Sequence, residues 1–248
     1  MDLGIAGKTA LVTGASRGLG FAAAQALTEE GCQVAICGRD SARISEAAAS
    51  LGAHPIVADM SAPDGPARAV AEATAEFGTV DILVANAGGP TPGGFMDVDD
   101  EDWEQAVRQN LMGTVRLMRA VVPQMRERGW GRIITITSRT VREAIDGLVL
   151  SNATRAGVAG AVRTLAREVA KEGITVNNVL PGSFATERLV ELHGSQAAVT
   201  ERAKASAMGR IGAPGELAAV IAFLASRQAS YVTGTSILVD GGESHAIA

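Results

Sequence analysis

The chain alternates short apolar runs with amphipathic, alanine-rich stretches, and this alternation constrains its fold more than any other feature. The runs are close to continuously apolar, as expected of parallel strands that are covered on both faces. They read KTALVTG, QVAIC, HPIVAD, VDILVANAG, GRIITITS, GITVNNVLPG and SILVDGG, and helical patterns lie between them at about 20–25, 41–51, 65–77, 99–128, 151–172 and 215–226. The sequence therefore predicts an α/β fold, a Rossmann-like doubly wound parallel sheet of about seven strands with helices on both faces.

No linker, repeat or low-complexity tract divides the chain, so we expect one domain over 1–248. The segment 183–213 interrupts the alternation, since it has several charges, glycines at 194, 209 and 212, and no strand pattern. It follows the sixth predicted strand, at the sheet edge where open α/β sheets bind ligands. We expect a lid over the substrate there; the alternative is a surface insertion without function.

Charge and composition exclude several classes of protein. The net charge of −5 gives no reason to expect a nucleic-acid or acidic-membrane partner. No apolar stretch reaches the ~18 residues of a membrane-spanning helix, and the first residues do not resemble a signal peptide. We expect Cys32 and Cys37 to be buried as small apolar residues, and the scattered His54, His193 and His245 to bind no metal. The prediction is a soluble cytoplasmic protein without a metal site.

A glycine-rich turn, TGASRGLG over 13–20, joins the first predicted strand to the first helix. Gly14, Gly18 and Gly20 would let the backbone approach a pyrophosphate, which a helix N-terminus attracts through its free N–H groups. The spacing is G-x-x-x-G-x-G rather than the G-x-G-x-x-G of other dinucleotide folds. A tight turn without a ligand also selects glycine, so further residues have to decide between a pyrophosphate loop and an ordinary turn.

Six more motifs follow in order along the chain. They are Asp59, ANAG at 85–88, NLMG from Asn110, Ser138, PGSFAT at 181–186 and DGG at 240–242. With the glycine-rich turn, this ordered set resembles the short-chain dehydrogenase/reductase family, and more narrowly its subgroup akin to 3-oxoacyl-carrier-protein reductases. The resemblance covers essentially the whole chain.

The resemblance implies a dinucleotide site. Asp59 would bind the adenine amino group with Met60 beside it, Asn86 and Gly88 would flank a ribose, and Thr186 would contact the nicotinamide side. The alternatives are a strand-end cap at Asp59 and a simple turn at 181–182. The implied cofactor-binding residues are Gly14, Ser16, Arg17, Gly18, Leu19, Gly20, Arg39, Asp59, Met60, Asn86, Ala87, Gly88, Pro181, Gly182, Phe184 and Thr186.

The end of the second predicted strand, CGRD, favours NADP over NAD. Gly38 stands where NAD-binding members of the family carry an acid for the 2′-hydroxyl. Arg39 follows it, and Arg17 reaches the same space, so two cations suit a 2′-phosphate. We expect Asp40 to cap the helix that starts beside Ser41.

The resemblance also implies the catalytic residues, and here the chain departs from the family. Ser138 and Asn110 match the serine that binds the carbonyl oxygen and the asparagine of the proton relay. Counting on from Ser138, the family's tyrosine and lysine positions are Ser151 and Arg155. An aliphatic hydroxyl is a far weaker acid than a phenol, and arginine relays no proton but holds a fixed charge. Carbonyl reduction is therefore the expected direction, with water as proton source.

Several interpretations of the site stay open. Arg139 and Arg142 would add to Arg155 around an anionic substrate, a carboxylate or a carrier-linked 3-oxoacyl group; alternatively they pair with Glu143 and Asp146. The activity is an NADP-dependent reductase of a small-molecule carbonyl compound, a non-catalytic NADP-binding sensor or scaffold, or non-redox chemistry on the same scaffold.

The resemblance finally implies a homotetramer, or a dimer as the fallback. Family members assemble through the two long helices predicted at 99–128 and 151–172. The second carries small residues that permit close approach, and the first carries Leu111, Val115 and Met118 beyond its core positions. The alternative is that the small residues only let the helix lie close to its own sheet.

Overall fold

The computed structural model describes residues 2–246, with the backbone alone at positions 193, 196, 200, 202 and 205. Over these residues the chain forms one seven-stranded sheet in the order β3-β2-β1-β4-β5-β6-β7, and every neighbouring pair is parallel. The strands are β1 (Thr9–Thr13), β2 (Gln33–Gly38), β3 (His54–Val57), β4 (Ile82–Asn86), β5 (Gly131–Ile136), β6 (Ile174–Pro181) and β7 (Ser236–Val239). The predicted doubly wound sheet is confirmed.

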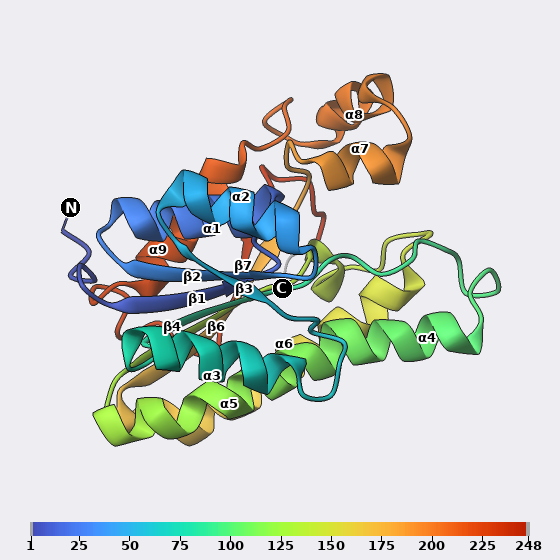
Figure 1. Cartoon of the computed structure of the whole chain (residues 1–248). Helices are drawn as coiled ribbons and strands as arrows, with labels where there is room; N and C mark the ends of the chain where they lie inside the picture. Colours follow the sequence, from blue (N-terminus) through green and yellow to red (C-terminus); the bar gives the residue numbers. More distant parts are fainter. Residues whose placement is uncertain (1, 247–248) are drawn as a thin grey trace.

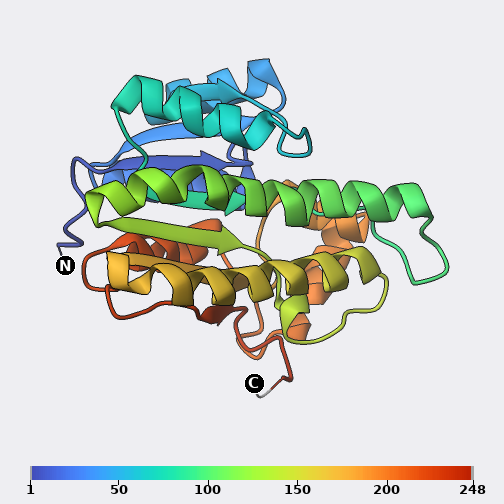
Figure 2. The same cartoon turned by 90° about the horizontal axis from the view of Figure 1, so that it is seen from below.

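Two layers of helices cover the sheet (Figure 1). The helices are α1 (Gly18–Glu29), α2 (Ser41–Leu51), α3 (Gly65–Phe77), α4 (Asp100–Ala106), α5 (Gly113–Arg128), α6 (Val149–Val169), α7 (Glu187–His193), α8 (Gln196–Arg202) and α9 (Pro214–Ala225). One face carries α1, α2 and α9, while α3, α5 and α6 lie on the other, as Figure 2 shows from below. No helix within residues 2–246 is long and apolar enough to cross a membrane.

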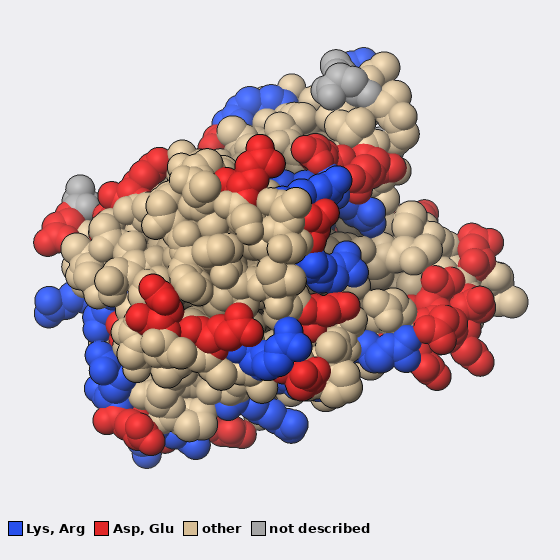
Figure 3. All heavy atoms as spheres, in the orientation of Figure 1, with Lys and Arg blue, Asp and Glu red and all other residues tan. Residues whose placement is uncertain are grey.

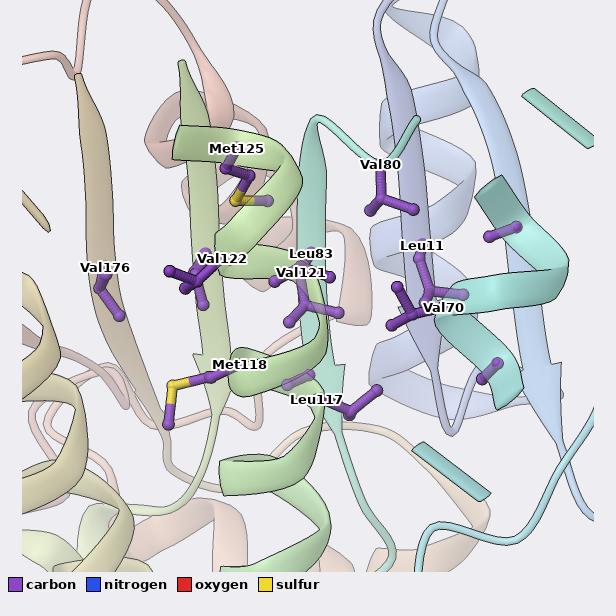
Figure 4. Close-up of a cluster of buried hydrophobic side chains, with 14 of the residues drawn as sticks. Leu11, Val70, Val80, Leu83, Leu117, Met118, Val121, Val122, Met125 and Val176 are labelled. Carbon is purple, nitrogen blue, oxygen red and sulfur yellow. The ribbon is translucent and has the colours of Figure 1, made fainter. Parts of the chain in front are cut away.

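Alternate strand residues supply the two cores. In β1, Leu11 belongs to the cluster under α3, α5 and α6, whereas its neighbours Ala10 and Val12 belong to the cluster under α1, α2 and α9. Figure 4 shows the first cluster, in which Met118 of α5 lies near Val176 of β6. Met118 is 3% exposed and belongs to this core. The prediction that it lies beyond the core positions, free for a subunit interface, is therefore wrong.

The helix predicted at 99–128 is interrupted. Asp99 caps α4, and the π-helix Val107–Met112 then separates α4 from α5. Gly113 lets the chain pass the carbonyl oxygen of Met60, which would lie 2.7 Å from a Cβ at that position. The wider turn carries Asn110, whose Nδ2 donates to the carbonyl oxygen of Gly88 at 2.8 Å. Such π-turns occur frequently at functional sites.

The segment 183–213 forms α7, α8 and a 3-10 turn, and it contains no strand, as its sequence predicts. An isolated bridge joins Phe184 to Gly212, and the Ala185 N–H donates to the Gly212 carbonyl at 2.9 Å. The segment therefore leaves the sheet and returns at one place. Figure 1 shows α7 and α8 projecting beyond the helical layer.

Both cysteines are free and buried, as predicted. Cys32 Sγ donates to the Ile5 carbonyl at 3.4 Å, and Cys37 Sγ donates to the Ala58 carbonyl at 3.7 Å. Burial raises the pKa of both thiols to about 12, so at neutral pH both act as small apolar residues.

Candidate functional site

A cavity of about 450 Å³ lies at the carboxyl ends of the strands, where the chain order reverses between β1 and β4. Most of the predicted site residues line it: Gly14, Ser16, Arg17, Gly18, Leu19, Arg39, Asp59, Met60, Asn86, Ala87, Gly88, Ser138, Ser151, Arg155, Pro181, Gly182, Phe184 and Thr186. Gly20 and Asn110 are not in the lining and lie behind it. Figure 3 shows basic side chains gathered in the hollow beneath α7 and α8.

Two glycines of the β1–α1 turn have packing roles. Gly14 has a φ of +58°, and a Cβ there would meet Asn86 Nδ2 at 2.9 Å. A Cβ at Gly20 would meet the Gly14 carbonyl oxygen at 2.4 Å. Asn86 Nδ2 donates to the same carbonyl at 3.0 Å, so the turn is fixed closely against β4.

The same turn presents the start of α1 to the cavity. Arg17 occupies the N-cap position, and its side chain makes no capping hydrogen bond. The first N–H groups of α1 are thus available to an anion, and the helix dipole favours negative charge there. This arrangement fits the pyrophosphate of a dinucleotide.

The cavity end beside β2 carries three arginines, Arg17, Arg39 and Arg43. A Cβ at Gly38 would lie 3.2 Å from Ile44 Cδ1, so packing leaves little room there for an acidic side chain. Asp40 Oδ1 accepts the Arg43 N–H at 3.0 Å, which confirms its predicted role as a helix cap. No described acid forms an ion pair with Arg39, whose charge is available to a ligand.

Arg17 connects the glycine-rich turn to α7. Its Nη1 pairs with Glu187, and its Nη2 lies 3.0 Å from Glu191 Oε1. The hydrogen bond to Glu187 raises the pKa of Arg17 most, so the guanidinium stays charged. The ion pairs hold α7 across the mouth of the cavity.

Asp59 forms the strand-end cap that the sequence left open as an alternative to an adenine contact. Its Oδ1 accepts from the Ser61 N–H at 2.9 Å and from Ser61 Oγ at 2.8 Å. One carboxylate oxygen therefore holds the turn after β3, while the residue also lines the cavity. A turn-forming role and an adenine contact are compatible at this position.

Thr140 connects Ser138, at the end of β5, with Ser151 of α6. The Thr140 N–H donates to Ser138 Oγ at 3.2 Å, and Thr140 Oγ1 lies 3.3 Å from Ser151 Oγ, in the first turn of α6. With its oxygen accepting from the backbone, the Ser138 hydroxyl can donate its proton into the cavity. Thr140 was missed by sequence reasoning, because its contact with Ser151 depends on how the loop folds back.

Arg155 lies one helical turn beyond Ser151 and is 7% exposed. Its Nη1 donates to the Ile136 carbonyl at 3.1 Å, and its Nε is buried without a partner. Burial first, and then the charge of Arg188, lower the pKa of Arg155 to about 10. The side chain therefore remains a cation at neutral pH.

Asn110 also carries a buried atom without a partner, Oδ1, although its Nδ2 is bonded to Gly88. Unsatisfied buried polar atoms are uncommon in folded proteins and concentrate where a ligand or a reaction requires them. The π-helix thus places an unpaired acceptor behind Gly88, which lines the cavity.

The structure corrects the expectation for two arginines. Arg139 pairs with Glu143 and lies 3.2 Å from Glu243, and Arg142 donates to the Ser236 carbonyl at 3.1 Å. Neither lines the cavity. The interpretation that both surround the substrate is therefore wrong. The alternative, pairing with acids of the same loop, holds for Arg139 with Glu143, whereas Arg142 binds a backbone carbonyl of β7 instead of Asp146.

A different arginine enters the cavity instead. Arg188 of α7 lines it, and its Nη2 donates to the Pro90 carbonyl at 3.0 Å. Sequence reasoning missed Arg188 because the segment 183–213 has no periodic pattern that assigns its faces.

The sequence profile of a family described as enoyl-(acyl carrier protein) reductase matches residues 14–244. The short-chain reductase protein NovJ of Streptomyces niveus is 38% identical over 243 residues, covering 94% of this chain and 92% of that protein. The 3-oxoacyl-[acyl-carrier-protein] reductase FabG of Vibrio cholerae is 37% identical over 242 residues, covering 97% and 98%.

Solved structures give the same family relationship. The L-sorbose reductase of Gluconobacter frateurii, complexed with NADPH and L-sorbose, superposes with a TM-score of 0.94 at 34% identity, and both chains are covered completely. The NADPH-dependent reductase YwfH, involved in bacilysin biosynthesis, superposes with a TM-score of 0.92 at 29% identity, covering 98% of this chain and 100% of that one.

Proposed function

Because this chain belongs to the short-chain dehydrogenase/reductase family, we propose that it is an NADP-dependent reductase of a small carbonyl compound. The observation that carries the proposal is that one cavity holds both groups of residues. It joins a glycine-rich turn and free arginine at one end to Ser138, Ser151 and Arg155 at the other. Bound NADPH would supply the hydride that adds to the carbonyl carbon. Anionic compounds and carrier-linked 3-oxoacyl groups are the candidate substrates.

The roles of the chain's own residues follow from their partners. Ser138 donates a hydrogen bond to the carbonyl oxygen, since its own oxygen already accepts from Thr140. Arg155 places a permanent positive charge beside the oxygen as it becomes an alkoxide. Asn110 offers its free Oδ1 to the proton relay. Water supplies the proton that completes the alcohol.

The atypical pair Ser151 and Arg155 belongs to this proposal. We assign them to the positions where the family pattern has tyrosine and lysine. The only tyrosine of the chain, Tyr231, is fully exposed and lies outside the cavity lining. Ser151 then contributes hydrogen bonding rather than acid strength, because an aliphatic hydroxyl does not ionise near neutral pH.

The segment 183–213 is proposed as the substrate lid. Two connections hold α7 over the cavity, the Arg17 pairs with Glu187 and Glu191 and the Arg188 bond to Pro90. These exposed ion pairs and this exposed hydrogen bond are weak enough to open. Closure of such a segment excludes water from the reacting groups.

A second candidate function rests on the same pair of residues. A site that lacks a titrating acid near neutral pH suits a non-catalytic NADP-binding sensor or scaffold, or chemistry without net redox change. NADPH binding without reduction of any carbonyl compound supports the first of these. Product formation without net NADPH oxidation supports the second.

Cofactor preference tests the nucleotide end of the site. NADPH should bind at least tenfold more tightly than NADH, a difference of about 1.4 kcal/mol, because Arg39 is available for a 2′-phosphate and glycine at position 38 provides no acid for a 2′-hydroxyl. Fluorescence titration of both cofactors measures it. Arg39→Asp should abolish the preference, whereas Arg68→Asp, on the surface of α3, should keep it. Equal affinities in the parent contradict the assignment.

Substitution of Arg155 and Ser151 separates their roles. Arg155→Ala should lower kcat/KM for a carbonyl substrate by ~10²-fold or more, the scale of losing one charge-stabilising donor. Ser151→Ala should cost less than about tenfold, because little acid strength is lost. Arg155→Lys keeps the charge and should retain more activity than Arg155→Ala. A silent Arg155→Ala beside an inactive Ser151→Ala would reverse the roles.

Thr140 should act only through Ser151. Thr140→Val keeps the N–H that holds Ser138 but removes the hydroxyl beside Ser151. We expect a loss of kcat/KM no larger than that of Ser151→Ala, and no further loss in the double variant. Thr154→Val is the control, since the Thr154 hydroxyl bonds only to Leu150 of its own helix. Additive losses would show that the two hydroxyls act independently.

The homotetramer is proposed from α5 and α6. Ala153, Ala156, Gly157 and Gly160 form an exposed stripe of small residues along α6. At Gly157 the small residue is also required within the chain, because the Leu111 side chain lies 3.2 Å from where a Cβ would be. Light scattering at micromolar concentration should give four times the 25.3 kDa mass of the chain, or twice it for a dimer. A monomeric mass contradicts this assembly.

A further inference from the structure

The cavity lining has an excess of arginines over acids, and two of these arginines are not among the three beside β2, where the cofactor phosphate is expected to bind. Among the described residues its lining holds five arginines against three acids, although the chain has a net charge of −5. The arginines are Arg17, Arg39, Arg43, Arg155 and Arg188, and the acids are Asp40, Asp59 and Glu187. The acids stand with the first three arginines, around the turns that follow β1, β2 and β3 and the start of α7. The two remaining arginines are Arg155, on α6, and Arg188, on α7 with its Nη2 bonded to the Pro90 carbonyl.

Arg155 is a buried charge without a compensating one. No described acid pairs with it; its Nη1 binds a backbone carbonyl, and its Nε has no partner. Burial of an unpaired charge is strongly unfavourable, and an unmade hydrogen bond adds to the cost. An anion in the cavity would compensate the charge of Arg155 and offer its Nε a hydrogen-bond acceptor.

Arg188 brings a second cation toward the same place. It binds the Pro90 carbonyl, and its charge contributes to the lowered pKa of Arg155. Its nearest acid, Glu191, lies 3.7 Å from Nη1 and also receives Arg17 at 3.0 Å. The two guanidinium groups therefore repel each other, and Glu191 neutralises Arg188 only in part. A ligand anion between them would remove the repulsion.

We propose that Arg188 binds a carboxylate of the substrate, with the charge of Arg155 nearby, so that the enzyme reduces small oxo acids. This inference rests on the proposed reductase function and narrows its substrate class. A carboxylate is planar and matches the guanidinium fork, and Leu148, Leu189 and Leu192 supply an apolar wall for a short carbon chain. A carrier-linked acyl group would bring a neutral thioester and leave both cations unpaired.

A matched pair of substrates tests the inference by kinetics. The free acid 3-oxobutanoate and its methyl ester differ in charge but share the carbonyl group. The parent should reduce the acid with a kcat/KM at least ~10-fold higher than the ester, as expected of a charge-assisted contact. Arg188→Met should bring this ratio close to one, mainly through the KM of the acid. Arg142→Met, outside the cavity, should leave the ratio unchanged.

Binding of malonate gives a readout that does not need turnover. Calorimetric titration of malonate into the protein saturated with NADP⁺ should show binding in the parent and its loss in Arg188→Met. Undiminished NADPH affinity in the variant shows that it is folded. A parent that reduces the ester as well as the acid overturns the carboxylate site and leaves the reductase proposal standing. If neither compound is reduced, the reductase proposal fails for this pair, and malonate binding alone decides whether the carboxylate site exists.

Discussion

All the strands of the sheet run in one direction, and the site depends on this constraint. Parallel strands place the loops that follow them at one edge, so residues far apart in the sequence meet there. The β5–β6 pairing sets Ile136 opposite Val179, and the Thr137 N–H continues the ladder to the Val179 carbonyl at 2.9 Å. Ser138 is thereby brought to the same level as the turn that begins at Pro181.

Close packing then fixes the loops at that edge. Asn86 holds Gly14 through its side-chain amide, and Gly20 allows the start of α1 to pass directly over the Gly14 carbonyl. Gly14 and Gly20, for which the sequence predicts cofactor contacts, are thus required by the protein's own packing. The free backbone N–H groups of α1 are a consequence of this packing, and they can bind an anion only because the loop is held in place.

The sequence predicts the sheet, the helical layers and most of the cavity lining, because these depend on periodicity and on strand ends. It does not predict contacts that depend on distant loops. Arg139 is neutralised by Glu243, which lies more than a hundred residues further along the chain, and Arg188 enters the cavity from an aperiodic segment. The π-helix at Asn110 was also missed, since a single widened turn leaves the apolar pattern of 99–128 almost unchanged.

Two fixed charges at the reactive end have different thermodynamic consequences. In the proposed site, a substrate carboxylate is charged before and during the reaction, so its contact with Arg188 would stabilise ground state and transition state alike and lower KM. The alkoxide charge would develop only in the transition state, so Arg155 beside it would raise kcat. The oxidation of an alcohol needs a base that takes up its proton. Arginine stays protonated and cannot be that base, and the Ser151 hydroxyl is too weak an acid to ionise and become one. The proposed site would therefore stabilise the product oxyanion until water protonates it, and the same composition would disfavour the oxidation of alcohols.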